Sequence, residues 1–141
     1  MIRKAALTKQ IYVTVDDEVG VLNRMADSLA DRGINIEAVA GYGMAGTGKA
    51  RVMLVVDDTR RACDLLRQKG FTDLEEREEI QVELDNKPGA LKGVTSLLAA
   101  KGINIRQLYG TMSSEKAPVR VVLATSDNQS AIVTLKKAVA K

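Results

Sequence analysis

Two groups of residues in this sequence have types and spacings that can do chemistry. Asp16, Asp17 and Glu18 form an acidic cluster, and adjacent carboxylates can act as general acids or bases or bind a divalent cation. Residues 41–46 (Gly-Tyr-Gly-Met-Ala-Gly) fit the glycine fingerprint of dinucleotide-binding proteins, and residues 43–49 fit most of a phosphate-binding loop. Each group therefore has a catalytic or nucleotide-binding interpretation that its surroundings must support.

The glycine motif is interpreted as a hairpin. Both phosphate-binding motifs aim backbone N–H groups and a helix N-terminus at phosphates, so a helix has to follow the glycines. Residues 51–56 (Arg-Val-Met-Leu-Val-Val) have a β pattern instead, and Ala50 stands where a phosphate-binding loop needs a hydroxyl for magnesium. We therefore predict a flexible turn between two strands and no nucleotide cofactor.

Composition excludes further classes. The 141 residues include one cysteine, Cys63, and no histidine, which excludes disulfides, the common zinc-ligand sets and histidine-dependent nucleophilic sites within one chain. The 21 basic and 18 acidic residues are interspersed, so the net charge of +3 does not indicate a nucleic-acid surface. No stretch approaches the roughly 20 apolar residues of a membrane span, and the first ten residues lack the apolar core of a signal peptide. We expect a cytoplasmic protein that uses no metal or cofactor and contacts neither nucleic acid nor membrane.

The elements that would position the chemical groups occur twice. Residues 33–36 (Gly-Ile-Asn-Ile) recur as residues 102–105, an offset of 69 (102 minus 33). Without any gap, the same offset superposes identical residues along the chain: Asp16 on Asp85, Gly20 on Gly89, Leu22 on Leu91, Gly41 on Gly110, Arg51 on Arg120, Leu54 on Leu123, Asp58 on Asp127 and Leu66 on Leu135. The sequence therefore predicts two tandem copies of one fold unit.

Each copy has the same order of predicted elements: a strand, a helix, two strands joined by a turn, and a second helix. In the first copy these are residues 11–15, the helix carrying Leu22, Met25 and Leu29, residues 34–40 and 50–56, and the helix that follows Asp58; in the second copy they are residues 80–84, the helix carrying Leu91, Val94 and Leu98, residues 103–109 and 119–125, and the helix that follows Asp127. With residues 71–78 as a closing strand, the order is that of an α+β, ferredoxin-like β-α-β-β-α-β unit with its helices on one face of the sheet.

The domain boundaries follow from the repeat. We expect a first domain at residues 1–78 and a second at residues 79–141, which ends where its own closing strand should begin. We hypothesise that residues 1–9 supply that missing edge strand to the second domain and place Ile2 and Ala5 in its core. Covering a sheet edge in this way protects it from pairing with other chains.

The repeat weakens the catalytic interpretations. The counterpart of the acidic cluster, at residues 85–87, is Asp-Asn-Lys and keeps one carboxylate, so acid–base catalysis or metal binding is not expected there. Cys63 is replaced by Ile132 in the other copy, which favours packing over a nucleophilic role. RNA-recognition modules share the predicted element order, but they stack bases on strand aromatics, and Tyr12 is replaced by Gln81. No catalytic residue is assigned.

The turn between the first strand and the first helix of each copy remains. Residues 86–91 (Asn-Lys-Pro-Gly-Ala-Leu), followed one helix later by residues 102–105, resemble the signature of ACT domains, small regulatory modules that bind free amino acids. The first copy departs from that signature, with Asp17 in place of the asparagine and Val19 in place of the proline. The resemblance covers almost the whole chain, apart from residues 1–9 and the absent last strand.

The chemistry of such a turn suits a small zwitterion. A glycine that opens a helix lets backbone N–H groups approach a carboxylate closely, and the helix N-terminus adds roughly half a positive charge. Asn86 or Asp17 can accept hydrogen bonds from the ligand's ammonium group. The alternative is that Asn86 and Asp17 only cap the helices, and that Gly20 and Gly89 only make the turns.

The resemblance implies that two modules pair side by side into one eight-stranded sheet, with the effector between the glycine turn of one module and the second strand of the other. The ligand-binding residues implied in this way are Asp17, Glu18, Val19, Gly20, Val21, Leu22, Asn35 and Ile36 in the first copy, and Asn86, Lys87, Pro88, Gly89, Ala90, Leu91, Asn104 and Ile105 in the second. Because the two turns differ, we expect unequal affinities, with residues 86–91 the better site.

The sequence thus favours a sensor of a free amino acid that has no enzymatic activity. It would act through its oligomeric state, expected to be a homodimer, or through a partner such as an amino-acid biosynthetic enzyme. The alternative is an interaction or oligomerisation module that binds no ligand, or a regulatory subunit of an enzyme of amino-acid metabolism.

Overall fold

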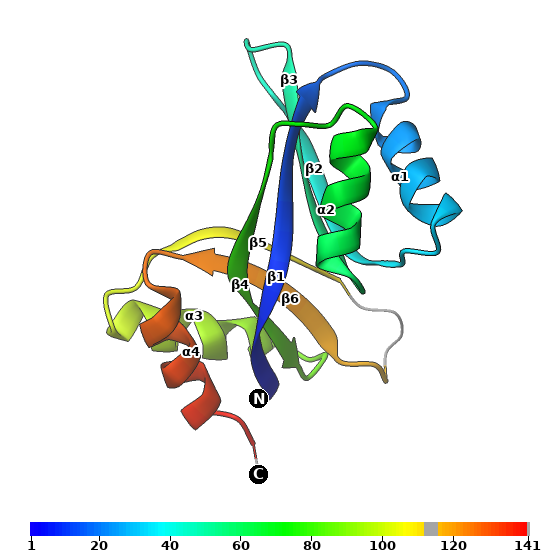
Figure 1. Cartoon of the computed structure of the whole chain (residues 1–141). Helices are drawn as coiled ribbons and strands as arrows, with labels where there is room; N and C mark the ends of the chain where they lie inside the picture. Colours follow the sequence, from blue (N-terminus) through cyan, green and yellow to red (C-terminus); the bar gives the residue numbers. More distant parts are fainter. Residues whose placement is uncertain (112–115, 141) are drawn as a thin grey trace. The chain divides into compact units, whose positions relative to one another are not determined.

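The computed structural model describes residues 1–111 and 116–140. It contains the strands β1 (Ile2–Asp16), β2 (Ile36–Met44), β3 (Lys49–Val56), β4 (Leu74–Leu84), β5 (Ile105–Thr111) and β6 (Val119–Thr125), and the helices α1 (Val21–Asp31), α2 (Thr59–Gln68), α3 (Ala90–Ala100) and α4 (Asn128–Lys137) (Figure 1). The chain divides into two compact units. We call Lys9–Glu78 the first unit, and Met1–Thr8 together with Glu79–Lys141 the second unit.

The first unit is an antiparallel sheet with two helices. Its strands lie in the order β2-β3-β1-β4, and Ile11 and Val13 of β1 pair with Leu54 and Val52 of β3. Both helices lie on the same side of these strands (Figure 1). Alternate residues of β1 therefore point toward the helices and form one buried core with them.

Helix α1 forms because its apolar residues recur at helical spacing. Val21, Met25 and Leu29 are four residues apart and are all buried. The helix ends before Gly33, whose φ of 69° is in the left-handed region and whose N–H donates to the carbonyl of Ala30. Gly33, the first residue of the repeated Gly-Ile-Asn-Ile segment, thus ends the helix, as its position in the sequence indicates.

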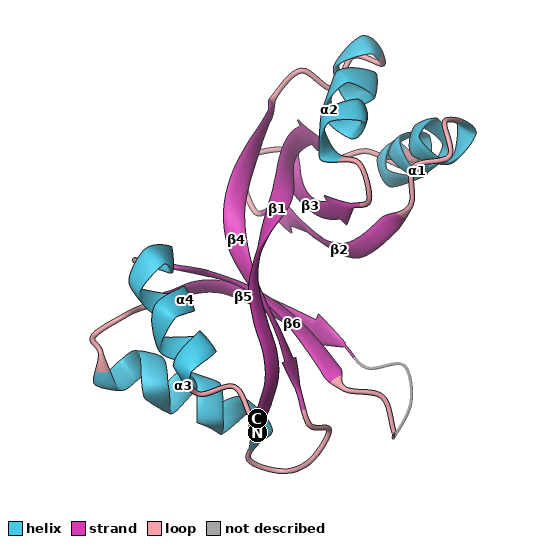
Figure 2. Cartoon of the chain, turned by 60° about the horizontal axis from the view of Figure 1, so that its bottom comes forward, coloured by secondary structure: helices cyan, strands magenta, loops and turns pink. Residues whose placement is uncertain are grey.

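The second unit repeats this plan. Its strands lie in the order β1-β4-β6-β5, and helices α3 and α4 lie next to each other on one side of them (Figure 2). Asp127 precedes α4 and its carboxylate accepts a hydrogen bond from the N–H of Ser130; Asp58 does the same before α2 for Arg61. The two copies therefore share their helix caps as well as their element order, and the expected α+β ferredoxin-like fold is confirmed.

The first residues of the chain pack in the second unit. Ile2 and Ala5 are buried in the core that contains Leu98 and Leu135. The carbonyl of Ile2 accepts a hydrogen bond from the N–H of Ala140, at 2.9 Å, and Ile2 forms a parallel bridge with Val139. The N-terminal half of β1 is therefore the edge strand of this unit.

The expected eight strands are wrong: the sheet has six, in the order β2-β3-β1-β4-β6-β5. Strand β1 joins the N-terminal segment to the strand predicted at residues 11–15, and β4 joins the closing strand predicted at residues 71–78 to the strand at residues 80–84. Neither stretch contains a glycine, proline or asparagine, so no turn interrupts either strand. Each of the two long strands contributes residues to both units.

The glycine motif lies mostly in a strand rather than in a turn. Strand β2 continues to Met44 through Gly41 and Gly43, which were expected in the turn. The turn comprises residues 45–48, where Gly46 and Gly48 have φ values of 78° and 70°. Strand β3 follows directly. In the second copy, the turn predicted between the strands at residues 103–109 and 119–125 includes residues 112–115, which lie outside the described residues.

Candidate functional site

The two glycine turns have the same backbone conformation. Gly20 precedes α1 with φ 85° and ψ 0°, and Gly89 precedes α3 with φ 85° and ψ −7°. Both lie in the left-handed region, which glycine enters without the steric penalty of a Cβ atom. The N-cap residue of each helix is this glycine, so neither helix has a side-chain hydrogen bond at its N-cap.

The missing caps leave backbone donors available. The N–H of Ala90 donates to the carbonyl of Lys87, at 3.2 Å, and the regular helical bonds begin with Gly93 and Gly89. Among the described residues, the N–H groups of Leu91 and Lys92 have no hydrogen-bond partner. Such a helix start, with its partial positive charge, favours an anionic group.

A cavity of about 280 Å³ lies beside the turn in the second unit. Its lining residues come from β4, the glycine turn, α3, β5 and β6: Leu84, Asp85, Asn86, Lys87, Ala90, Leu91, Leu108, Gly110, Val119 and Val121. The polar residues are the consecutive three that begin the turn, and the remaining walls are apolar. The cavity thus combines one polar end with an apolar interior.

Asp85 at the polar end is surrounded by cations. Its carboxylate pairs with the guanidinium of Arg3, with the ammonium of Lys87 at 3.7 Å and with the amino group of Met1 at 3.9 Å. The hydrogen bond from Arg3, followed by the charges around it, holds the pKa of Asp85 below its usual range. Because Asp85 is ionised and neutralised, it presents no net negative charge to an anion in the cavity.

The turn in the first unit has different surroundings. Asp17 lies across the turn: its N–H donates to the carbonyl of Gly48, at 2.9 Å, and its carboxylate oxygen is so close to Gly43 that a Cβ there would lie 2.7 Å away. Val19, where the second copy has Pro88, is fully exposed. Asp17 therefore occupies the space on the strand side of this turn, the side on which the second unit has its cavity.

The residues that open the second strands lie elsewhere within their units. The N–H of Asn104 donates to the hydroxyl of Ser126, at 2.9 Å, and Ile105 pairs with Thr125, whereas Gly110 at the other end of β5 pairs with Val121 beside the cavity. Asn35 and Ile36 have the corresponding places: Ile36 pairs with Val56, and the N–H of Asn35 donates to the carboxylate of Asp57. Within its own unit, each of these residues is at the end of the sheet away from the glycine turn.

Six residues of the cavity were not predicted from the sequence, namely Leu84, Asp85, Leu108, Gly110, Val119 and Val121. The available signal was the repeated glycine at positions 41 and 110, since a glycine inside a strand often marks a close backbone approach. A Cβ on Gly110 would lie 2.9 Å from the carbonyl oxygen of Arg120, so this position has no room for a side chain.

The surroundings of Cys63 do not favour a reactive thiol, and the acidic residues that the structure describes do not form a metal site. Cys63 is buried, and its thiol contacts the carboxylate of Glu76 at 3.4 Å; burial and this contact raise the pKa of Cys63 to about 12, so the thiolate is strongly disfavoured at neutral pH. Within residues 1–111 and 116–140, no three histidine, cysteine or acidic side chains are grouped to hold a metal ion.

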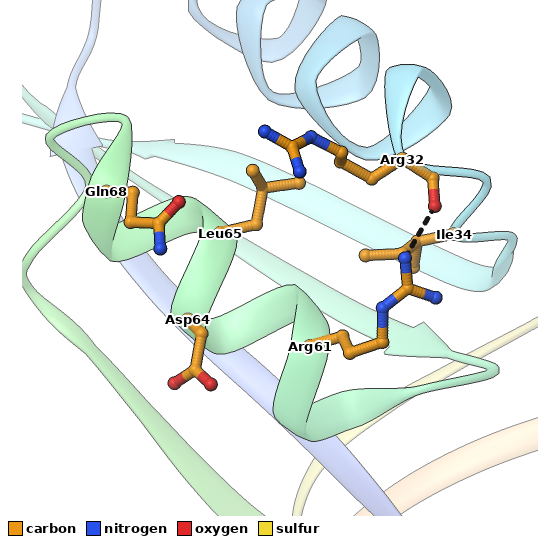
Figure 3. A pocket seen from close by; sticks show the side chains of 6 residues that line it. All are labelled: Arg32, Ile34, Arg61, Asp64, Leu65 and Gln68. Atoms are coloured by element: carbon orange, nitrogen blue, oxygen red, sulfur yellow. Dashed lines mark hydrogen bonds between the residues drawn. The ribbon is translucent and has the colours of Figure 1, made fainter.

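A smaller cavity, of about 140 Å³, lies between the end of α1 and the helix α2. Figure 3 shows Arg61 reaching from α2 to the carbonyl oxygen of Arg32, to which its guanidinium donates a hydrogen bond of 2.8 Å. Arg32 is the C-terminal cap of α1, so Arg61 satisfies a carbonyl at the negative end of that helix. This contact links the C-terminal end of α1 to α2.

Comparison with known proteins agrees with the glycine turns and the element order. Residues 11–69 and 80–141 match the family model described as AHAS small subunit-like ACT domain. A search of curated proteins finds no match to the chain. In the part of the chain that the structure describes, no helix is long and apolar enough to cross a membrane.

Solved structures with a similar fold include a protein from Bacteroides thetaiotaomicron, at 25% identity and a TM-score of 0.85 over 95% of this chain and 90% of that chain. The regulatory subunit of aspartate kinase from Thermus thermophilus is similar at 18% identity and a TM-score of 0.67, over 97% of each chain. That from Thermus flavus is similar at 16% identity and a TM-score of 0.62, again over 97% of each chain. Because the family model covers both copies, the chain belongs to the family of AHAS small subunit-like ACT domains.

Proposed function

We propose that this protein is a regulatory sensor that binds a free aliphatic amino acid in the cavity beside residues 86–91. The observation that carries the proposal is the combination of unpartnered N–H groups at the start of α3 with an apolar cavity of about 280 Å³. A free amino acid has the matching arrangement, with two charged groups at one end and a side chain at the other.

The charged end of the ligand has partners on the turn. Its carboxylate would accept hydrogen bonds from the N–H groups of Leu91 and Lys92, aided by the partial charge of the helix. Its ammonium group would donate to the side-chain oxygen of Asn86, which is exposed beside the cavity. Asp85 would be a weaker partner, because three cations already neutralise it.

The side chain of the ligand would fill the apolar part. Leu84, Leu108 and Val121 offer no hydrogen bond to a polar side chain, so a serine or aspartate ligand would lose its hydration without compensation. An aliphatic side chain gains about 25 cal/mol for each Å² that it buries. We therefore expect valine, leucine, isoleucine or methionine to bind and charged amino acids to fail.

Binding would be relayed to another state of the protein or to a partner. The aspartate kinase relatives are named as regulatory subunits of a kinase, which supports a role beside an enzyme rather than as one. A ligand changes the pairing of subunits only if it binds one arrangement more tightly than another. We propose that the filled cavity favours one such arrangement, either of two copies of this chain or of this chain with an amino-acid biosynthetic enzyme.

A thermal-shift screen of the twenty amino acids tests the proposal. Ligand at a hundredfold excess over its Kd stabilises the folded state by about 2.7 kcal/mol, which raises the Tm by several degrees. Aliphatic amino acids should produce this shift and the acidic and basic ones should not. If none of the twenty changes the Tm, the protein is an interaction module without a ligand.

Matched variants assign the binding to the cavity. Gly89→Asp places a carboxylate where the ligand's own carboxylate would lie, and Leu108→Asn puts an amide into the apolar wall; we expect each to weaken binding in calorimetry by at least about tenfold. Gly20→Asp and Val39→Asn are the matched controls, because they make the same changes at the equivalent positions of the first unit. Equal effects of test and control variants would contradict the assignment.

A further inference from the structure

The first unit contains a cavity that the proposed function does not use. It has a volume of about 280 Å³ and lies among the end of β1, the first two turns of α1, the start of β3 and the connection from α2 to β4. All of its lining residues belong to the first unit. This cavity is called the charged cavity below.

Charged side chains line the charged cavity from several elements. Asp16 at the end of β1 pairs with Lys49 at the start of β3, and the contact lowers the pKa of Asp16 and raises that of Lys49. Glu18 pairs with the guanidinium of Arg24 at 2.9 Å. These four groups neutralise one another in pairs.

Two further charges are left without an ion pair. Lys69 caps the end of α2, Asp73 lies just before β4, and both line the charged cavity. Among the described residues, the ammonium of Lys69 and the carboxylate of Asp73 have no opposite charge within 4.0 Å, although Asp73 is near enough to contribute to the raised pKa of Lys49. The cavity thus has one cation and one anion that a ligand could contact.

The connection that carries these two charges is held in place. The N–H of Phe71 donates to the carbonyl of Leu66, and the carbonyl of Asp73 accepts from the N–H of Thr14, both at 2.9 Å. Phe71 is buried in the core, and the guanidinium of Arg24 lies 5.7 Å from the centre of its ring. A site whose backbone is already ordered loses little entropy when it binds a ligand.

The fold itself does not require these charges. At the offset of 69, the second copy has Gly93 for Arg24, Pro118 for Lys49 and Ala138 for Lys69. Both copies nevertheless form the same β-α-β-β-α arrangement. The unit therefore forms without these three cations.

We propose that the charged cavity binds a small polar zwitterion, with its carboxylate on Lys69 and its ammonium group on Asp73. The hydroxyl group of Thr72, an exposed residue that also lines the cavity, would bind a polar side chain such as that of serine, threonine, asparagine or glutamine. An aliphatic side chain would find few apolar walls here. The site is distinct from the cavity beside residues 86–91 and does not depend on the function proposed for it.

The test is a titration of the full chain, labelled with ¹⁵N, with L-serine, L-threonine, L-asparagine and L-glutamine. At about 10 mM, which fills most of even a millimolar site, at least one of these should shift the amide signals of Gly70 and Thr72. Lys69→Met and Asp73→Asn should each weaken that binding about tenfold, the effect of losing one hydrogen bond to a charged group.

Two controls make the result decisive. Lys101→Met makes the same change at the exposed C-terminal cap of α3, outside the charged cavity, and should leave the affinity unchanged. Both test residues are exposed, so the amide spectrum outside the site should show that the variants fold. The proposal is overturned if none of the four amino acids shifts Gly70 and Thr72, or if both variants bind as the wild type does. Either result leaves the binding of aliphatic amino acids in the second unit unaffected.

Discussion

The glycine turn of the second unit borders a largely apolar cavity, whereas the same turn of the first unit borders a charged one. The backbone of the two turns is nearly identical, with φ 85° at Gly20 and at Gly89. The difference comes from the side chains that precede the two glycines, since Asp17 crosses its turn toward Gly43 while Asn86 lies beside an open cavity. The two copies therefore keep the same backbone conformation at the helix start, while the side chains around it give each copy a different cavity.

The difference also shows which residues are free to vary between the copies. Helix caps, core positions and turn glycines recur at the offset of 69, because the fold needs them in each copy. Around the first turn Asp16 recurs as Asp85, whereas Glu18, Arg24 and Lys49 are replaced by Lys87, Gly93 and Pro118. Three pairs of substitutions test this comparison, beginning with the largest expected effect.

The matched glycines Gly110 and Gly41 should respond unequally to alanine. At Gly110 a Cβ would lie 2.9 Å from both the carbonyl oxygen of Arg120 and a methyl of Val121, whereas at Gly41 its nearest contact is at 3.4 Å. We expect Gly110→Ala to destabilise the second unit by about 1–3 kcal/mol, as overpacking does, and Gly41→Ala to cost the first unit less than about 1 kcal/mol. Urea unfolding followed by NMR signals of each unit measures both; equal losses would contradict the comparison.

Arg61 links the two helices of the first unit, and the second copy has Ser130 at its place. We expect Arg61→Ala to destabilise the first unit by about 1 kcal/mol, because the carbonyl of Arg32 loses its partner. The neighbouring Arg60→Ala is the control and should change stability by less than about 0.5 kcal/mol. Hydrogen exchange at the end of α1 provides the measurement. If the Arg61→Ala variant exchanges no faster than the wild type, the hydrogen bond from Arg61 to Arg32 does not stabilise the helix end.

The smallest expected effect concerns acid. Asp85 and Asp16 have lowered pKa values in the folded state, held by Arg3 and Lys49 respectively. A lowered folded pKa gives stability that is present above the ordinary value of about 3.9 and is lost as the pH falls through the folded value. Arg3→Ala should therefore raise the pKa of Asp85 toward its ordinary value and leave Asp16 unchanged, and Lys49→Ala should do the reverse. Carboxyl ¹³C titration checks this, and a wild-type Asp85 that titrates at its ordinary value would refute it.

Much of the fold could be predicted because it depends on local patterns. The alternation at residues 11–15, the helical spacing of Val21 and Met25, and the glycine stop at Gly33 each depend on neighbours in the chain. The fusion of strands into β1 and β4 was missed, because the number of strands was taken from the family and not from the absence of turn residues. The resemblance to ACT domains itself is confirmed.

The residues that line the candidate sites could not be predicted from the sequence. Which residues of β5 and β6 line a cavity depends on register, and the pairing of Gly110 with Val121 cannot be obtained from either strand alone. The same is true of Lys69 and Asp73, which the α2–β4 connection brings to the end of β1 through a hydrogen bond to Thr14. The turns can be found from their sequence signature. The residues that would determine ligand specificity depend on how the strands pair, which the sequence of one strand does not give.

Strand β1 also has a consequence for how the protein is made. The first unit comprises Lys9–Glu78, so all of its residues have been made before most of the second unit. The second unit places Ile2 of β1 in the same core as Leu135 of α4, and these two residues are made far apart in time. During synthesis the apolar side chains of Ile2 and Ala5 are thus without their core until α4 has been added.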